Sequence, residues 1–314
     1  DITVGRVKQL KPWQQKRKLL QKLDTIIIDE ISMVRADLLD CLYKFMRLNG
    51  RVKEAPFGGY QLVFIGDLYQ LPPVESTQDE SEGSLLGEYL SPYFFDSHVF
   101  GQIDCHMIEL EKVYRQKDHE FIALLNAVRD NRANLEDLEK LNRQVNSDFQ
   151  FEEGDLVISL TTTNARANAI NQNYLGQLTG EAKKYRGRIN GDFLTKRLPT
   201  EEVTLLRVGS QVMLLNNDME GRWVNGTMGK ILAFEKQEEK ADIIVVELED
   251  GTTCEVEPYT WEFFKYVFDS ETNRIESEVV GSFTQYPIKL AWAVTIHKGQ
   301  GKTFSKVHID LGSG

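Results

Sequence analysis

The stretch TIIIDEIS, residues 25–32, places a continuous apolar run directly before two carboxylates. Such a β-branched run predicts a strand that is buried on both faces, as in a parallel sheet. The residues that follow carry apolar side chains at helical spacing and predict a helix that ends near Asn49–Gly50. A second buried strand is expected at 61–65, after a turn at 57–59. Strand, helix and strand in this order predict a parallel crossover and an α/β fold.

Polar residues follow both predicted strands. Asp29 and Glu30 have the form of a Walker B motif, in which the first acid holds magnesium through water and the second polarises an attacking water. Asp67 and Gln70 follow the second strand, before a Leu-Pro-Pro loop that continues neither helix nor sheet. Gln70 is expected to face Asp29, where a neutral amide can sense a terminal phosphate. Each motif alone is also typical of a surface cap or a strand exit, but the two together favour a site.

A second α/β region is predicted from 106 to 203. The segment MIELEKVYR, residues 107–115, predicts a strand and a turn. Two helices are expected near 121–130 and 135–145. DLVISLTTT predicts another short strand, after which Thr163 and Asn164 can cap a helix.

The pattern changes to short strands from 204 to 285. Asn225–Gly226 and Asp250–Gly251 are hairpin turn signals between these strands, so a small antiparallel β-barrel or sandwich is expected. The α/β pattern returns afterwards, which indicates that the barrel is an insertion. The predicted parts are 1–105, 106–203, 204–285 and 286–314.

Composition limits the class of protein. The chain has 314 residues, a net charge of -11 and 41% hydrophobic residues. No window of about 18 apolar residues occurs, so membrane-spanning, collagen-like and disordered classes are excluded. Three isolated cysteines and five scattered histidines predict a reducing compartment and no metal cage built by the protein alone.

The charge distribution leaves the choice of partner open. An acidic total argues mildly against nucleic acid, whose phosphates are bound through clustered lysine and arginine. Basic residues nevertheless gather at 6–22 and 183–188. They are expected to be either solvated surfaces or parts of a basic groove on an acidic body.

Arg115, in ELEKVYRQ, is a candidate phosphate ligand. Its planar and permanently charged guanidinium suits phosphate oxygens and can stabilise a transferred phosphoryl group. The alternative is a surface ion pair with Glu111 or Asp118.

The segment AWAVTIHKGQGKTF, residues 291–304, ends in a GKT triplet that resembles part of a Walker A motif. Walker A needs a glycine five residues before its Gly-Lys pair, and Ile296 stands there instead. The expectation is therefore a strand that delivers His297, Lys298 and Gln300 into a glycine-containing turn.

Five segments in this order, DEIS, GDLYQLPPV, LEKVYRQ, VNGTMG and TIHKGQGKTF, resemble the PIF-type DNA helicases, the RecD-like branch of superfamily 1B. The resemblance covers nearly the whole chain. It implies two RecA-like domains, the first truncated at its N-terminus, with the small barrel inserted in the second. It also implies an ATP-driven and magnesium-dependent motor that moves 5′ to 3′ on single-stranded DNA and opens duplexes, forks and G-quadruplexes, in DNA repair, recombination or telomere maintenance.

The resemblance assigns roles to the candidate residues. Asp29 would hold magnesium, Glu30 would position water, Gln70 would touch the terminal phosphate and Arg115 would be the arginine finger. Gly301 would lie against the nucleotide, in a turn that bridges nucleotide and DNA. DNA phosphates would be bound by a set of neutral and basic donors: Asn164, Thr295, His297 and Lys298.

Two departures from the family pattern qualify this reading. The Walker A loop of the family lies upstream of DEIS and its final arginine motif lies beyond residue 314, so we expect an internal fragment that is inactive alone. The alternatives are a single-stranded DNA-binding module that needs no nucleotide and a motor that has decayed. The expected partners are single-stranded and forked DNA, and no membrane partner is expected. The protein is expected to be a monomer, in the cytoplasm of a bacterium or in the nucleus or mitochondria of a eukaryote.

Overall fold

The computed structural model describes residues 4–11, 14–74, 89–114, 118–146, 148–151, 155–192, 198–238, 241–269, 271–272 and 274–310. The chain divides into two compact units, residues 1–149 with 266–276, and residues 150–265 with 277–314. Each unit is described by itself. Among the described helices, none has the length and apolar character needed to cross a membrane.

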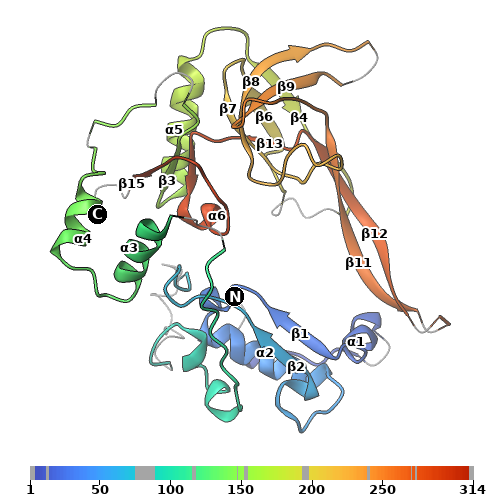
Figure 1. Ribbon diagram of the computed structural model, residues 1–314. Coiled ribbons are helices and arrows are strands. Elements are labelled where there is room, and N and C mark those ends of the chain that lie inside the picture. The colour runs from blue at the N-terminus through green and yellow to red at the C-terminus, as the bar shows by residue number, and fades with distance from the viewer. Residues whose placement is uncertain are drawn as a thin grey trace. The chain divides into compact units, whose positions relative to one another are not determined.

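The first unit contains the predicted strand, helix and strand (Figure 1). Its helices and strands are the 3₁₀ turns at Val4–Arg6, Ile31–Met33, Pro56–Gly59, Phe94–Asp96 and Phe100–Gln102, the helices α1 (Gln15–Leu20), α2 (Ala36–Asn49), α3 (His119–Arg129) and α4 (Leu135–Asn142), and the strands β1 (Thr25–Ile28) and β2 (Gln61–Phe64). β1 and β2 pair in parallel, with Thr25 opposite Gln61 and Ile28 opposite Phe64, which confirms the predicted crossover.

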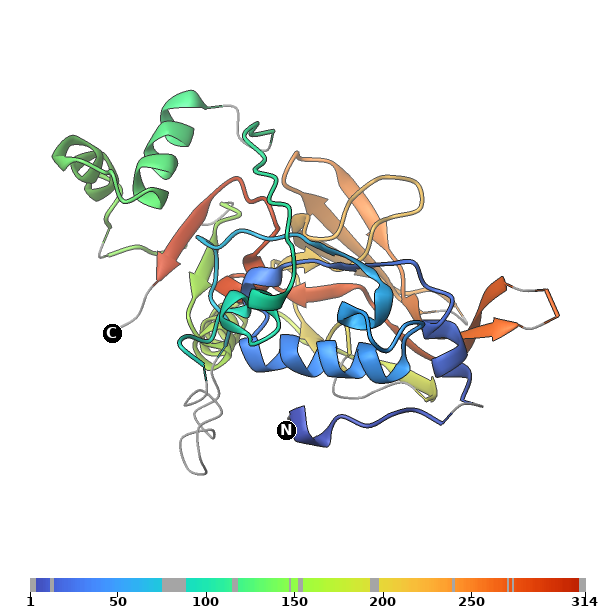
Figure 2. The same cartoon turned by 90° about the horizontal axis from the view of Figure 1, so that it is seen from below.

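One face of this two-stranded sheet packs on α2 (Figure 2). Ile26 and Ile28 contact a buried cluster that includes Leu39 and Met46 of α2. Ile27 points to the other face and is 64% exposed. The prediction of a strand buried on both faces is therefore wrong for the described chain, because the described residues cover only one side of the sheet.

The predicted strand in MIELEKVYR is also wrong. Residues 107–114 form no strand, and Met107 and Leu110 are about nine-tenths exposed. β propensity does not form a strand unless a neighbouring strand supplies hydrogen bonds, and none of the described strands pairs with this segment.

Strands predominate in the second unit. Its elements are β3 (Ile158–Thr161), α5 (Asn164–Gln177), β4 (Lys183–Arg186), β5 (Arg188–Gly191), β6 (Val203–Leu206), β7 (Gln211–Leu214), β8 (Met228–Glu235), β9 (Ile243–Leu248), β10 (Thr253–Val256), β11 (Tyr259–Asp269), β12 (Arg274–Gln285), β13 (Ile288–Leu290), β14 (Ala293–Thr295), α6 (Ile296–Gly299) and β15 (Val307–Asp310). The strands β11 and β12 form a hairpin whose distal residues, 266–276, are grouped with the first unit.

Antiparallel strands occupy most of the region from 204 to 285, as predicted. The largest sheet has the order β10-β9-β8-β7-β13, and β11-β12-β5 and β4-β6 form separate sheets. Asp250–Gly251 lies in the hairpin turn between β9 and β10, where the N–H of Gly251 donates to the Leu248 carbonyl at 2.9 Å. The described strands do not form one closed ladder, so closure into a barrel is not confirmed.

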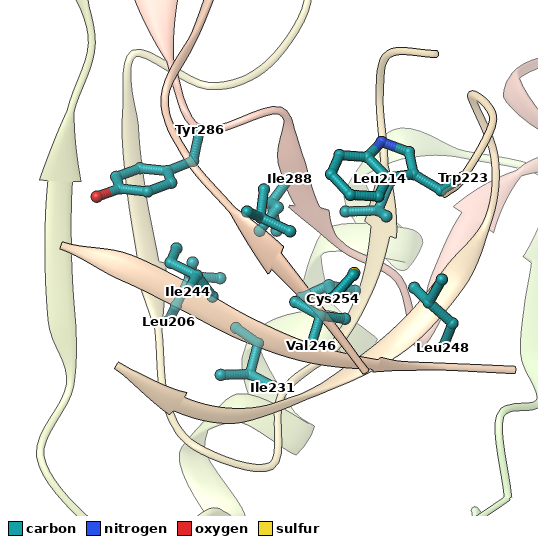
Figure 3. Packing of buried hydrophobic residues seen from close by; sticks show 12 residues of the cluster. Leu206, Leu214, Trp223, Ile231, Ile244, Val246, Leu248, Cys254, Tyr286 and Ile288 are labelled. Carbon is teal, nitrogen blue, oxygen red and sulfur yellow. The ribbon is translucent and has the colours of Figure 1, made fainter. Parts of the chain in front are cut away.

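The core of the large sheet is made by alternate residues of its strands (Figure 3). Leu214, Ile231, Val246 and Ile288 are fully buried in it, and Trp223 covers one end. Burial of this apolar surface is the main stabilising contribution to the unit.

A separate parallel sheet has the order β14-β3-β15. β3 and β14 are in register, with Thr161 opposite Thr295. The helix α5 follows β3, and the buried Ala167 and Leu175 lie on it. This sheet fixes the segment that carries the predicted DNA-binding residues.

Candidate functional site

The carboxyl ends of β1 and β2 bring the first group of candidate residues together. The N–H of Ile65 donates to the Ile28 carbonyl at 2.9 Å, and the N–H of Ile31 donates to the Ile65 carbonyl at 2.9 Å. Asp29 and Glu30 leave the sheet between these two bonds. The segment that begins at Gly66 leaves it alongside them, as parallel strands require.

Glu30 makes a tight turn directly after β1. Its backbone has φ 51° and ψ 46°, in the left-handed region, and its N–H donates to Oδ1 of Asp29 at 2.9 Å. This conformation is costly for a residue other than glycine, by roughly 1 kcal/mol. Strain of this kind concentrates at functional sites. In the same turn, the Oγ of Ser32 is buried with no hydrogen-bond partner among the described residues.

A glycine lies where β2 leaves the sheet. A Cβ atom on Gly66 would lie 3.0 Å from the backbone nitrogen and from Cγ2 of Ile31. These contacts are tighter than most Cβ atoms make, so the absence of a side chain lets the two strand exits pass each other without a shift of Ile31.

Asp67 organises the loop that carries Gln70. Its Oδ1 accepts the N–H of Tyr69 at 3.0 Å, and its Oδ2 accepts a hydrogen bond from Nε2 of Gln70 at 3.2 Å. Gln70 therefore lies at the same sheet edge as Asp29, with its amide nitrogen bonded to Asp67. A direct approach of Gln70 to Asp29 stays a prediction.

The donor set at this edge fits magnesium. The described residues contain no group of three or more His, Cys, Asp or Glu side chains that could enclose a metal ion. Magnesium does not need such a group, because it retains several waters and binds through one or two carboxylates and the phosphates of its substrate. Asp29 is exposed beside Glu30 and supplies a carboxylate of this kind.

The second group of candidates lies at the carboxyl edge of the parallel sheet in the second unit. Thr295 ends β14, is only 4% exposed, and caps the single-turn helix α6 by accepting the N–H of Lys298 on its Oγ at 3.4 Å. His297 and Lys298 are exposed on that turn. Gly301 follows with φ 74°, a conformation that favours glycine.

Asn164 lies at this same edge. Thr163, and not Asn164, is the cap of α5, since its Oγ accepts the N–H of Arg166 at 3.2 Å. Asn164 is the exposed first residue of the helix. β3 and β14 end side by side, so the structure brings Asn164 close to the segment from Thr295 to Lys298.

Two polar contacts near this edge were not predicted. The buried amide of Asn171 donates to the Ala293 carbonyl at 2.8 Å and accepts the Ala293 N–H at 2.9 Å. The ammonium of Lys302 donates to Oδ1 of Asn225 at 2.9 Å. Both contacts join residues more than 70 positions apart, and only the lysine in the otherwise apolar run IKLAWAV hinted at polar surroundings here.

The charges of two neighbouring lysines act on Lys289 in this region. Burial lowers the pKa of Lys289 to about 8, and the positive charges of Lys302 and Lys298 add to the shift. Burial also lowers the pKa of Lys302. Arg115, the remaining candidate, lies outside the described residues, so its proposed role stays a prediction.

Comparison with known proteins gives a consistent result. Residues 3–139 match the family model described as PIF1-like helicase. The chain is 30% identical to the ATP-dependent DNA helicase Pif1 of Campylobacter jejuni, over 97% of the chain and 67% of that protein. It is 32% identical to the ATP-dependent DNA helicase PIF1 of Xenopus laevis, over 91% of the chain but only 42% of that protein, so it spans less than half of this relative.

Solved structures of the same kind are similar to the chain. Bacteroides Pif1 in complex with ADP-AlF4 has 35% identity and a TM-score of 0.83, covering 98% of this chain and 70% of that one. Bacteroides Pif1 bound to single-stranded DNA has 35% identity and a TM-score of 0.58, covering 96% and 69%. The α/β fold of the chain therefore matches that of Pif1 helicase structures.

Proposed function

The chain belongs to the PIF1-like helicase family, and on this premise we propose that it is part of an ATP-dependent DNA helicase that moves 5′ to 3′ along single-stranded DNA. Duplex, forked and G-quadruplex DNA are the proposed substrates of the whole protein, which acts as a monomer inside the cell. The observation that supports the proposal is that Asp29 and Glu30 follow one strand, and the loop with Asp67 and Gln70 follows its parallel partner, at the same edge of the sheet.

Each residue at this edge has a separate role in the proposed reaction. Asp29 would hold magnesium through water, and the ion would supply positive charge at the terminal phosphates of ATP. Glu30 accepts a hydrogen bond from the attacking water and increases its nucleophilicity. Gln70 contacts the terminal phosphate, and Arg115 stabilises the charge that builds on the transferred phosphoryl group. Gly301 lies against the nucleotide.

Single-stranded DNA is the proposed track. Its phosphates are bound by Asn164, Thr295, His297 and Lys298, whose donors do not depend on base sequence. The Bacteroides Pif1 structure with single-stranded DNA supports this partner. In this proposal, 1–105 belongs to the first RecA-like domain, 106–203 and 286–314 to the second, and 204–285 to a small inserted barrel.

The test is the substitution Glu30→Gln in the full-length gene product. The amide retains the shape of the side chain but cannot polarise water, so ATP turnover stimulated by single-stranded DNA should be abolished. Binding of a fluorescent ATP analogue should stay as in the wild type. Glu54→Gln is the matched control, since Glu54 is an exposed glutamate of the same unit.

Two results would refute parts of the proposal. Wild-type turnover in Glu30→Gln would remove Glu30 from the chemistry. A wild-type protein that binds single-stranded DNA equally well with and without ATP, and hydrolyses no ATP, would instead support the alternative of a DNA-binding module that needs no nucleotide.

A further inference from the structure

The GKT triplet, residues 301–303, does not complete a Walker A motif, and its lysine makes a contact within the second unit instead. Lys302, its central residue, lies over the loop before β8. Its Nζ donates to Oδ1 of Asn225, and a Cβ added to Gly226 would lie 3.3 Å from the same Nζ. Gly226 has φ 106°, a backbone conformation that favours glycine. Its lack of a side chain also leaves room for the Lys302 side chain.

This loop is joined to the strand that carries Lys289. The N–H of Gly226 donates to the Leu214 carbonyl at 2.8 Å, at the end of β7. Leu214 is opposite Ile288 in the pairing of β7 with β13, and both side chains lie in the core of the large sheet (Figure 3). Lys289, the next residue of β13, therefore projects from the other face of the sheet.

That other face is where the segment with Lys298 and Lys302 packs. Lys289 is opposite Met213, which belongs to a buried cluster with Val294 and the partly buried Phe304. Val294 and Phe304 lie on either side of the segment from 296 to 303 in the sequence. Three lysines from β13, α6 and the turn after α6 thus converge on one side of the sheet.

The described residues provide no counter-charge for this group. Neither Lys289 nor Lys302 forms an ion pair with any described carboxylate, although the chain holds 48 acidic residues against 37 basic ones. Lys302 has the neutral amide of Asn225 as a hydrogen-bond partner, and a partly buried ammonium without a carboxylate keeps a charge that no described residue balances. Such an arrangement is typical of a site whose anion comes from outside.

We propose that Lys289 and Lys302, with Lys298 and the amide of Asn225, form a binding site for a phosphate group. The favoured source is the backbone of single-stranded DNA, because Lys298 lies at the sheet edge that the proposed function assigns to DNA, and in this respect the proposal rests on that function. Lys302 positions Asn225 through their hydrogen bond. Lys289 supplies positive charge from the face of the large sheet on which the segment from 296 to 303 packs. A nucleotide phosphate is the other source of the same chemistry.

Removal of each ammonium tests the site. Lys289→Met and Lys302→Met keep the length of the side chain, and Lys306→Met is the matched control because Lys306 is exposed and pairs with Asp155 at 2.6 Å. Anisotropy with two unrelated labelled oligonucleotides over a salt series gives the affinity and its salt dependence. We expect each of the first two variants to bind both oligonucleotides several-fold more weakly, with a slope of log affinity against log salt that is shallower by up to about one unit. Lys306→Met should match the wild type.

A stability measurement separates binding from folding. Lys289→Met removes a poorly hydrated charge, so its free energy of unfolding should equal or exceed that of the wild type while its DNA affinity falls. Lower stability together with lower affinity would show that Lys289 is structural and would overturn its role as a phosphate ligand.

Binding of labelled ADP identifies the source of the phosphate. Loss of DNA affinity with unchanged ADP affinity supports the DNA backbone, and loss of ADP affinity alone assigns the site to a nucleotide phosphate. If both lysine variants match Lys306→Met in both assays, the site is refuted while the helicase proposal stands. A wild-type protein that binds no single-stranded DNA refutes the proposed function itself.

Discussion

Replacement of Asn171 with alanine should destabilise the second unit by about 3 kcal/mol. Among the described strands, β14 is an edge strand paired with β3 alone, and the Asn171 amide bonds to the opposite side of Ala293 as a further strand would. Asn171 is 8% exposed and Ala293 is 1% exposed, so water cannot replace the two lost bonds without a rearrangement. Each buried backbone group left without a partner costs about 1–3 kcal/mol.

A second asparagine of α5 supplies the control. Asn173 is exposed on the same helix, so Asn173→Ala reports only the gain in helix propensity, about 0.5 kcal/mol. This gain is present in both variants, and the difference between them isolates the contact with Ala293. Urea unfolding measures the free energies, and hydrogen exchange measures the protection of the Ala293 amide.

The expected pattern is specific. Asn171→Ala should lower the free energy of unfolding and speed exchange at Ala293, whereas Asn173→Ala should do neither. Equal unfolding free energies in the two variants, with unchanged exchange at Ala293, would refute the reasoning that this amide completes the edge of the sheet.

Three further predictions concern single side chains. Arg115→Ala in the full-length gene product should lower ATP turnover by about 10³-fold with DNA affinity nearly intact, and a loss of DNA affinity alone would identify a DNA contact. Lys298→Ala should weaken single-strand binding alike for unrelated sequences and make the salt slope shallower by up to about one unit, which anisotropy would check. Hydrogen bonds from the Arg222 guanidinium hold the pKa of Asp218 at about 2, below its unfolded value. Its stabilising contribution should be complete above about pH 4 and lost as the pH falls toward 2, so the difference in unfolding free energy between the wild type and Asp218→Asn should shrink over that range.

Local patterns in the sequence determined the first part of the fold. The run at 25–28, the helical spacing up to Asn49 and the run at 61–65 gave β1, α2 and β2 because apolar periodicity reflects which side chains face a core. Polar residues directly after two paired parallel strands must lie at one edge of the sheet, so the sequence could assign Asp29 and Gln70 to the same edge, whereas their direct approach stays a prediction. Turn chemistry likewise located the hairpin between β9 and β10.

Contacts between distant segments could not be obtained in this way. The apolar segment 107–114 resembles a strand but finds no partner, and Ile27 lies on a face that no described residue covers. The sequence also gave no indication that Lys302 meets Asn225 or that Asn171 meets Ala293. Periodicity and turn residues depend on neighbours within a few positions and determine which elements form. Strand partners, the covered side of a sheet and the surroundings of a buried lysine depend on segments brought together from far along the chain, and only the tertiary structure decided these.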